Sequence, residues 1–250
     1  MEAPTEPARR PVYRRVLLKL SGEALAGDGG VGFDPDVLQL VASEVRDITS
    51  RGVQVAIVVG GGNIVRGSDL SRRLGIDEVT GHTMGMLATV INGLALMDAM
   101  ERIGLVVRVL SSIEMHQVAE PYIRRRALRH LEKGRVVIFV GGTGSPYFST
   151  DTAAALRAIE MQADAVLMAK KGVSGVYDKD PRQHPDAVMF SHLDYMDILN
   201  RDLRVMDATA AALCKDNKMD IVVFDVTLPG NIPRAVAGDP IGTLVGGGRA

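Results

Sequence analysis

The sequence is poor in several residue types, and each shortage narrows what the chain can be. Its 250 residues include no tryptophan, five tyrosines, five phenylalanines and one cysteine, Cys214. A single cysteine excludes an internal disulfide and fits a reducing compartment. Because Cys214 follows a run of alanine and leucine, we interpret it as a small buried core residue.

An excess of charge of one sign is also missing. The chain has 29 Lys and Arg against 30 Asp and Glu, for a net charge of -1. An anionic ligand must therefore be held by local groups and not by a global basic field. This balance disfavours a dedicated nucleic-acid-binding protein, and we interpret the basic run at residues 124–129 as a solvated helix face or a subunit contact.

Long apolar runs are absent as well. No segment is expected to span a bilayer, and the first eleven residues lack the apolar centre of a secretory signal. We expect no membrane association and a cytoplasmic location. Residues 1–12 are predicted to form a disordered tail, residues 13–245 a single domain, and residues 246–250 a second tail.

Strand and helix signals alternate along the rest of the chain. Strands are predicted at residues 15–20, 54–59, 106–110, 135–140, 165–169, 221–224 and 243–245. Helices are predicted at residues 34–51, 83–103, 121–132, 152–161 and 232–237, with two more between 194 and 217. This alternation indicates an α/β fold, a three-layer αβα sandwich around a mostly parallel sheet. Residues 27–32 are expected to form a mobile loop, and residues 172–180 turns or a hairpin closed by Asp180-Pro181.

Residues 136–151 are the most informative segment. A run of apolar, mostly β-branched residues stops in glycines, passes through a polar loop and ends in Ser-Thr-Asp before an alanine-rich stretch. This pattern predicts a buried strand, a loop and a capped helix start. Free backbone N–H groups at such a helix end attract anions, and glycines let a ligand approach the backbone. The segment therefore predicts a phosphate-binding loop.

A second glycine turn, Gly60 to Gly62 followed by Asn63, comes after another apolar strand. It lacks the glycine spacing of a dinucleotide fingerprint, and no GxxxxGK[ST] motif occurs, so a Rossmann dehydrogenase and a P-loop enzyme are disfavoured. Two turns of this kind suggest two phosphates, a donor and an acceptor. Because ligands sit at the carboxyl ends of parallel strands, both turns should share one edge of the sheet with Lys19, at the end of the first strand.

Three charged residues are candidates for the chemistry. Lys19, in an apolar strand, needs a partner or a path to water, and we favour a role as a cation on a transferring phosphoryl group. Asp151 at a helix start could be a cap, or it could orient Lys19. Arg66 is placed for a bidentate phosphate contact, although a lone arginine is more often a surface residue.

No His, Cys or Ser lies in an arrangement with an obvious general base, and no metal-ligand spacing occurs. A phosphate monoester has a second pKa of about 6 and is already an anionic nucleophile at neutral pH. A kinase that phosphorylates a phosphate needs positioning and charge neutralisation and no general base.

Several motifs occur in a familiar order. They are Leu-Lys-Leu-Ser-Gly-Glu at 18–23, Gly-Gly-Gly-Asn at 60–63 with Arg66, Met-Gly-Met-Leu-Ala-Thr at 84–89, Gly-Thr-Gly with Pro-Tyr-Phe-Ser-Thr-Asp between 142 and 151, and Gly-Val-Tyr at 175–177 with Asp180-Pro181. Over residues 13–245 the chain resembles the bacterial uridylate (UMP) kinases, which have the amino-acid-kinase fold. The resemblance implies phosphoryl transfer from ATP to UMP with Mg²⁺ in pyrimidine nucleotide biosynthesis, a homohexamer, activation by GTP and inhibition by UTP.

The resemblance also implies site residues. The ATP site would comprise Lys19, Leu20, Ser21, Gly22, Gly62, Arg66, Lys171, Tyr177 and Asp180, with Lys170 as the alternative to Lys171. The UMP site would comprise Gly61, His82, Thr143, Gly144, Ser145, Pro146, Tyr147, Phe148, Ser149 and Thr150. The loop linked to GTP would comprise Gly27, Asp28, Gly29, Gly30, Val31 and Gly32. Lys19, Asp151 and Arg66 would be catalytic.

One position departs from the family. Where the family has an acidic UMP contact before its Met-Gly-Met helix, this chain has His82. An imidazole can still donate or accept a hydrogen bond, so a UMP contact is retained in the prediction. Two other functions stay open: a kinase for a carboxylate or carbamate on the same fold, and a non-catalytic nucleotide- or oxyanion-binding protein.

Overall fold

The computed structural model describes residues 10–66, 74–200, 203 and 206–247, so most of both predicted tails (1–9 and 248–250) lies outside it. Within the described residues, nine strands form one sheet in the order β4-β3-β5-β2-β1-β6-β10-β11-β9. The strands are β1 (Arg15–Leu20), β2 (Gln54–Val59), β3 (Val107–Ser111), β4 (Glu120–Pro121), β5 (Val136–Val140), β6 (Ala165–Lys170), β9 (His192–Leu193), β10 (Asp220–Asp225) and β11 (Thr243–Val245). Neighbours are parallel except β10 and β11.

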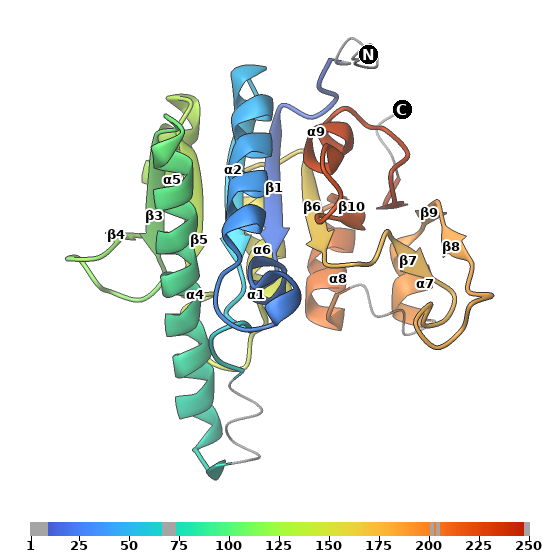
Figure 1. Ribbon diagram of the computed structural model, residues 1–250, viewed down its shortest axis with the longest axis horizontal. Coiled ribbons are helices and arrows are strands. Elements are labelled where there is room, and N and C mark those ends of the chain that lie inside the picture. The colour runs from blue at the N-terminus through green and yellow to red at the C-terminus, as the bar shows by residue number, and fades with distance from the viewer. Residues whose placement is uncertain (1–9, 67–73, 201–202, 204–205, 248–250) are drawn as a thin grey trace.

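Helices cover both faces of the sheet (Figure 1). The α-helices are α1 (Gly22–Leu25), α2 (Pro35–Ser50), α4 (Glu78–Arg102), α5 (Arg124–Glu132), α6 (Thr150–Glu160), α7 (Tyr195–Asn200), α8 (Ala208–Asp216) and α9 (Asn231–Val236). Side chains of α2, α4 and α9 share one core with one face of the sheet, and those of α5, α6, α7 and α8 share a second core with the other face. The predicted three-layer αβα sandwich is confirmed.

Alternation along the central strands assigns each side chain to a face. In β1, Val16, Leu18 and Leu20 belong to the α2 core, whereas Leu17 belongs to the α6 core. Since successive side chains of a strand point to opposite faces, Lys19 lies on the α6 face. The same rule places Lys170, at the end of β6, on the α6 face.

Several element boundaries differ from prediction for local reasons. Helix α4 begins at Glu78 and not near Thr83, because the Asp77 carboxylate accepts a hydrogen bond from the Thr80 N–H at 3.0 Å and caps the helix. Residues 120–121 pair with β3 as β4, so α5 starts later than expected.

The glycine-containing loops also differ from prediction. β7 (Val176–Tyr177) pairs with β8 (Met189–Phe190), so the hairpin extends past Asp180-Pro181. The loop expected at residues 27–32 contains a 3-10 turn at Gly27–Gly29, and the short helix α1 was not predicted.

Helix α4 corrects the expectation that no segment is long enough to cross a membrane. By length and composition it could do so, and 44% of its most apolar window is buried. It packs against α2, β3 and β5, with Leu96 and Met100 fully buried in the α2 core. These contacts are those of a core helix, for which length and composition alone are weak evidence of a membrane span.

Two helix starts predicted to be capped are capped, although α6 begins at Thr150 and not at residue 152, and its cap is Ser149 and not Asp151. The Asp34 carboxylate accepts from the Asp36 N–H at 2.9 Å, with Pro35 in the first turn of α2. The Ser149 hydroxyl accepts from the Thr152 N–H at 3.0 Å at the start of α6. Helix α6 starts near Gly60, which directly follows β2, and therefore at the carboxyl edge of the sheet. The arrowheads of β1 and β6 lie next to α1 at this edge (Figure 1).

Candidate active site

Lys19 and Asp151 meet at the carboxyl edge of the sheet. The Lys19 ammonium lies 2.8 Å from Asp151 Oδ1, with 8% and 18% of the two side chains exposed. Lys19 comes from β1, and Asp151 from the first turn of α6, where a carboxylate is favoured by the helix dipole. The predicted pairing of these two residues is confirmed, and a buried cation is held at a helix N-terminus.

The loops that follow β1 and β2 meet next to this pair. A Cβ at Gly22 would lie 2.6 Å from the Gly62 backbone nitrogen and 2.5 Å from the Asn63 side chain, so only glycine fits. The ideal Cβ position of Gly60 is 3.6 Å from the Thr150 hydroxyl. The loops after β1 and β2 and the start of α6 therefore share one edge, as predicted.

Lys170 is a second cation beside Lys19. Burial lowers the pKa of Lys170, and the nearby Lys19 ammonium lowers it further, while Asp151 and Glu23 act in the opposite direction. Two cations so close together repel each other unless negative charge lies between them. The arrangement is suited to an anion that both ammonium groups contact.

A cavity of about 420 Å³ opens on the Thr150 side of this centre. Of the residues expected to bind UMP, seven line it: Gly61, His82, Ser145, Tyr147, Phe148, Ser149 and Thr150. Gly62 and Arg66, expected at the ATP phosphates, line this cavity too. Arg66 also forms an ion pair with Glu23.

The C-terminal part of the loop over this cavity is held by two sets of contacts. His82 Nδ1 accepts a hydrogen bond from the Tyr147 N–H at 2.9 Å, and the two rings are edge to face with centroids 4.8 Å apart. At the start of α6, the Asp207 carboxylate accepts from the hydroxyls of Ser149 and Thr152. Asp207 itself caps α8, so the start of α6 is tied to a helix far along the chain.

A cavity of about 550 Å³ opens on the Lys170 side. Lys170, Tyr177 and Asp180 line it, together with Gly175 and Val223. Lys171 turns away, because its ammonium contacts the Gly27 carbonyl oxygen and lies 3.7 Å from the Asp28 carboxylate. Of these two lysines, Lys170 lines this cavity and Lys171 does not.

Some expected contacts are limited by burial or position. Leu20 is fully buried in the α2 core, so only its backbone can reach a ligand. Thr143, Gly144 and Pro146 belong to the loop between β5 and α6, but they are not part of the wall of the 420 Å³ cavity. Thr143 instead stabilises the loop, since its hydroxyl accepts from the Ser145 N–H at 3.2 Å.

A buried amide pair that was not predicted from the sequence lies behind the glycine turn. Asn92, on α4, donates to the Gly60 carbonyl oxygen and to Asn63 Oδ1, each at 2.6 Å. Asn63 in turn donates to the Gly32 carbonyl oxygen at 2.7 Å. A polar residue on the buried face of a predicted helix was the available signal, because buried amides need partners.

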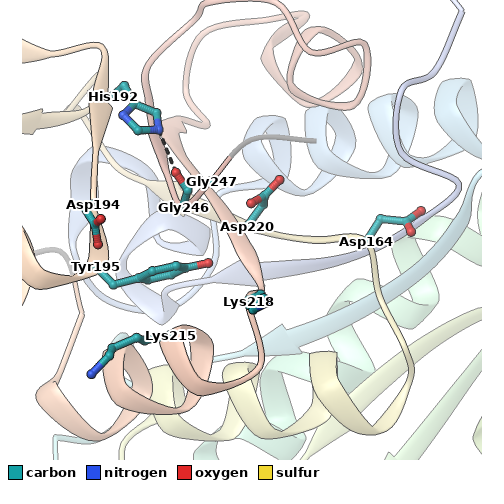
Figure 2. Close-up of a pocket in the computed structure, with 9 residues that line it drawn as sticks. All are labelled: Asp164, His192, Asp194, Tyr195, Lys215, Lys218, Asp220, Gly246 and Gly247. Carbon is teal, nitrogen blue, oxygen red and sulfur yellow. Dashed lines mark hydrogen bonds between the residues drawn. The ribbon is translucent and has the colours of Figure 1, made fainter. Parts of the chain in front are cut away.

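Another cavity, of about 490 Å³, lies at the opposite edge of the sheet (Figure 2). Asp164 precedes β6 and Asp220 begins β10, so this cavity is at the amino ends of the strands. Its walls carry both Lys215 and Lys218 and several carboxylates. It is therefore remote from the Lys19 centre.

The carboxyl-edge geometry can bring two phosphorylated molecules together. Thr150 lines one cavity and Lys170 lines the other, and the Lys19–Asp151 pair lies next to both residues, at the start of α6. The two lysines and the N-terminus of α6 can together neutralise negative charge. Among the residues that the structure describes, no group of three or more His, Cys, Asp or Glu could hold a metal ion. The arrangement fits transfer of a phosphoryl group between two bound anions.

Comparison with known proteins agrees with this geometry. Residues 14–225 match the amino acid kinase family. A UMP kinase from Bacillus anthracis is 44% identical, with 95% of this chain and 97% of that chain covered and a TM-score of 0.91. A UMP kinase from Ureaplasma parvum is 38% identical (94% and 99% covered, TM-score 0.88), and a uridylate kinase from Archaeoglobus fulgidus is 28% identical (92% and 99%, TM-score 0.71). The chain belongs to the amino acid kinase family, and within it to the UMP kinases.

Proposed function

We propose that this protein is a uridylate kinase, which transfers the γ-phosphoryl group of ATP to UMP and releases UDP and ADP. The observation that carries the proposal is the Lys19–Asp151 pair at the carboxyl edge of the sheet, next to Thr150 in the wall of one cavity and close to Lys170 in the wall of the other. The similarity to UMP kinases over almost the whole chain supports the same substrates.

In this mechanism the acceptor phosphate attacks the γ-phosphorus in line, without a general base. Lys19 and Lys170 stabilise the negative charge on the transferred group, and Asp151 holds the Lys19 ammonium in place. Backbone N–H groups at the start of α6 add donors that need no reorganisation during the reaction.

Mg²⁺ would enter with the phosphates of ATP. Magnesium commonly binds one or two carboxylates together with substrate phosphates and water, and does not require a dedicated protein cage. Asp151 and Glu23 are the carboxylates near the two lysines, although Asp151 pairs with Lys19 and Glu23 with Arg66. When bound, the ion would neutralise charge on the β- and γ-phosphates.

Acceptor selection would rest on the loop at residues 143–150. Its hydroxyls, with Gly61 and Arg66, would hold the UMP phosphate and ribose, and His82 would shape the loop through Tyr147. On the donor side, Tyr177 and Asp180 would contact the adenosine of ATP.

Regulation and assembly belong to the same proposal. GTP would activate through residues 27–32, and hydrogen bonds between Gly32 and Asn63 support a link from this loop to the glycine turn. Inhibition by UTP, a homohexamer, a cytoplasmic location and a place in pyrimidine nucleotide synthesis are proposed by resemblance.

ADP release with UMP, CMP, AMP, GMP and acetylglutamate offered in parallel tests the proposal. A strong preference for UMP is expected. Turnover with acetylglutamate would indicate a carboxylate kinase, and no turnover with any acceptor would favour a binding protein.

A further inference from the structure

Arg157 is a buried arginine that the phosphoryl-transfer chemistry does not use. It lies on α6, the helix that begins beside Asp151, and only 4% of it is exposed. Its Nη1 forms an ion pair with Glu160 Oε2 at 2.5 Å, and its guanidinium carbon lies 3.8 Å from the centroid of the Tyr122 ring. The Tyr122 hydroxyl donates to the same Glu160 oxygen at 2.6 Å, so the guanidinium is held on two sides.

The other end of the guanidinium reaches the acceptor-side loop through one serine. Arg157 Nη2 donates to the Ser112 hydroxyl at 2.8 Å, and that hydroxyl donates to the Gly142 carbonyl oxygen at 3.0 Å. Gly142 lines the acceptor cavity. A continuous chain of contacts therefore runs from the middle of α6 to the cavity wall.

Ser112 touches the same loop a second time. Gly144 has φ of +84°, and a Cβ there would lie 3.0 Å from the Ser112 carbonyl oxygen. A shift of Ser112 would thus disturb both Gly142 and Gly144. Because a trans peptide is planar, fixing the Gly142 carbonyl also fixes the direction of the Thr143 N–H, which points the opposite way.

The guanidinium is not placed for stability alone. Its Nε is buried and has no hydrogen-bond partner among the residues that the structure describes. Replacing a buried ion pair by apolar residues is often neutral or stabilising, and an unsatisfied buried donor adds a cost. What the charge provides here is a fixed orientation for Ser112.

We propose that Arg157 is a positioning residue that acts through Ser112 to hold the peptide between residues 142 and 143 for acceptor binding. The inference rests on the proposed function, since the acceptor is taken to be UMP. It concerns acceptor binding and leaves donor binding unaffected.

Ser112→Ala and Arg157→Lys test the inference, with Ser111→Ala as the matched control. Ser111 is a buried serine of the same turn, but its hydroxyl bonds to Ile113 and not to residue 142. We expect Ser112→Ala and Arg157→Lys each to raise the KM for UMP about fivefold while the KM for ATP stays within twofold. The double variant should be no worse than the poorer single variant, because both changes break one chain of contacts.

Comparing the KM for UMP with the KM for ATP separates loss of loop positioning from a general loss of packing. A KM for UMP that is unchanged in Ser112→Ala, or a KM for ATP that rises equally, overturns the inference; so does Ser111→Ala raising the KM for UMP as much. If Arg157→Lys fails to fold, Ser112→Ala alone decides. Absence of UMP turnover in the unmodified protein would instead contradict the proposed function.

Discussion

Lys19 and Lys170 come from the adjacent parallel strands β1 and β6 and lie on the same face of the sheet, the face covered by α6. The register pairs Lys19 with Met168 and ends at Leu20 with Ala169, so Lys170 lies one residue beyond the strand pairing, at the carboxyl end of the sheet. Asp151 at the start of α6 contacts Lys19 at 2.8 Å and favours the charged form of Lys170. This cluster of two cations and one anion is the proposed centre of phosphoryl transfer.

Lys19→Ala should remove most turnover while leaving UMP binding largely intact. The lysine contributes to the transition state more than to the bound acceptor, and losing one such contact costs about 10²–10³-fold in kcat. ADP release gives kcat, and calorimetry of UMP binding gives the control. Turnover within a few-fold of the unmodified protein would show that Lys19 has no role in catalysis.

Lys170→Met and Lys171→Met form a matched pair. We expect Lys170→Met to lower kcat by about 10²-fold and Lys171→Met to lower it less than tenfold, since Lys170 lines the cavity proposed for the donor and Lys171 does not. Side-by-side kcat values check this. The reverse order would restore the choice of Lys171 made from the sequence.

The pH dependence of turnover should follow Lys170. Burial and the Lys19 charge lower the pKa of Lys170 below that of an ordinary lysine, so its proton is lost at a lower pH. Activity should therefore fall at an alkaline pH below the pKa of an ordinary lysine. The fall should move to higher pH in Lys170→Arg, because arginine stays charged. Identical alkaline limbs in the two proteins would contradict this.

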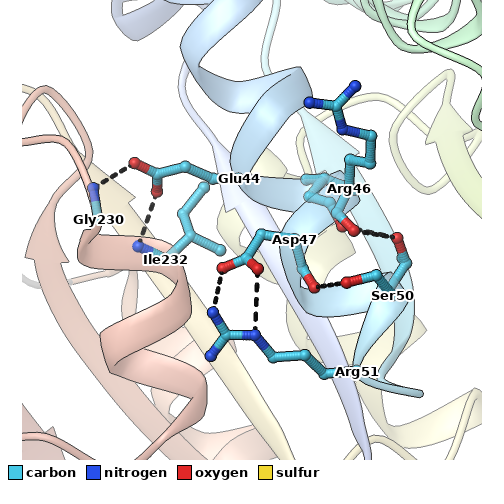
Figure 3. Close-up of polar contacts among 9 residues, drawn as sticks. Glu44, Arg46, Asp47, Ser50, Arg51, Gly230 and Ile232 are labelled. Atoms are coloured by element: carbon cyan, nitrogen blue, oxygen red, sulfur yellow. Dashed lines mark hydrogen bonds and ion pairs between the residues drawn. The ribbon is translucent and has the colours of Figure 1, made fainter. Parts of the chain in front are cut away.

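Glu44, on α2, should make stability depend on pH (Figure 3). Its carboxylate accepts from the N–H groups of Gly230 and of Ile232, the latter at 2.9 Å, yet burial outweighs these bonds and raises its pKa above 4.5. A raised carboxyl pKa means that the folded protein binds the proton more tightly than the unfolded chain. The contribution of Glu44 to stability is therefore greatest at acid pH and is lost as pH rises through the folded pKa.

Comparison of Tm between the unmodified protein and Glu44→Gln measures that loss. The Tm of Glu44→Gln relative to the unmodified protein should rise as pH increases from about 4.5 toward 7, because glutamine carries no charge to bury. A Tm difference that falls over this range, or does not change, would show that burial of the Glu44 charge carries no net cost.

Asn92→Ala should destabilise the glycine turn. It leaves the Gly60 carbonyl and the Asn63 side chain without their shared partner in a buried site, at a cost of about 2 kcal/mol. Asn217→Ala is the control, because that exposed amide donates to the Leu213 carbonyl oxygen at the end of α8; its effect should stay within about 0.5 kcal/mol. Urea unfolding measures both, and equal losses would mean that the buried amide pair adds nothing.

Much of the fold could be predicted because its signals are local. The apolar runs of β1, β2 and β5 and the caps Asp34 and Ser149 each lie within a few residues of the element they define. Lys19 and the glycine turns could be brought together from topology alone, because parallel strands end at one edge.

The remaining site features depended on which face of a strand each side chain occupies and on contacts with residues far away in the sequence. The period of two along β6 puts Lys170 on the Lys19 face and directs Lys171 to the α2 side, where it contacts Gly27. This signal was present in the sequence, but it needed the exact end of β6. Asn92, Arg157 and Asp207 act through residues 32, 45 and 58 positions away, and no local pattern predicts such contacts.

The most direct test of the account uses a compound that joins adenosine and uridine 5′ to 5′ through a polyphosphate chain. If donor and acceptor lie on opposite sides of the Lys19–Asp151 pair, this compound should inhibit competitively against both ATP and UMP, and Lys19→Ala should weaken its binding. Competition with only one of the two substrates would contradict the central claim that both phosphates meet at this pair.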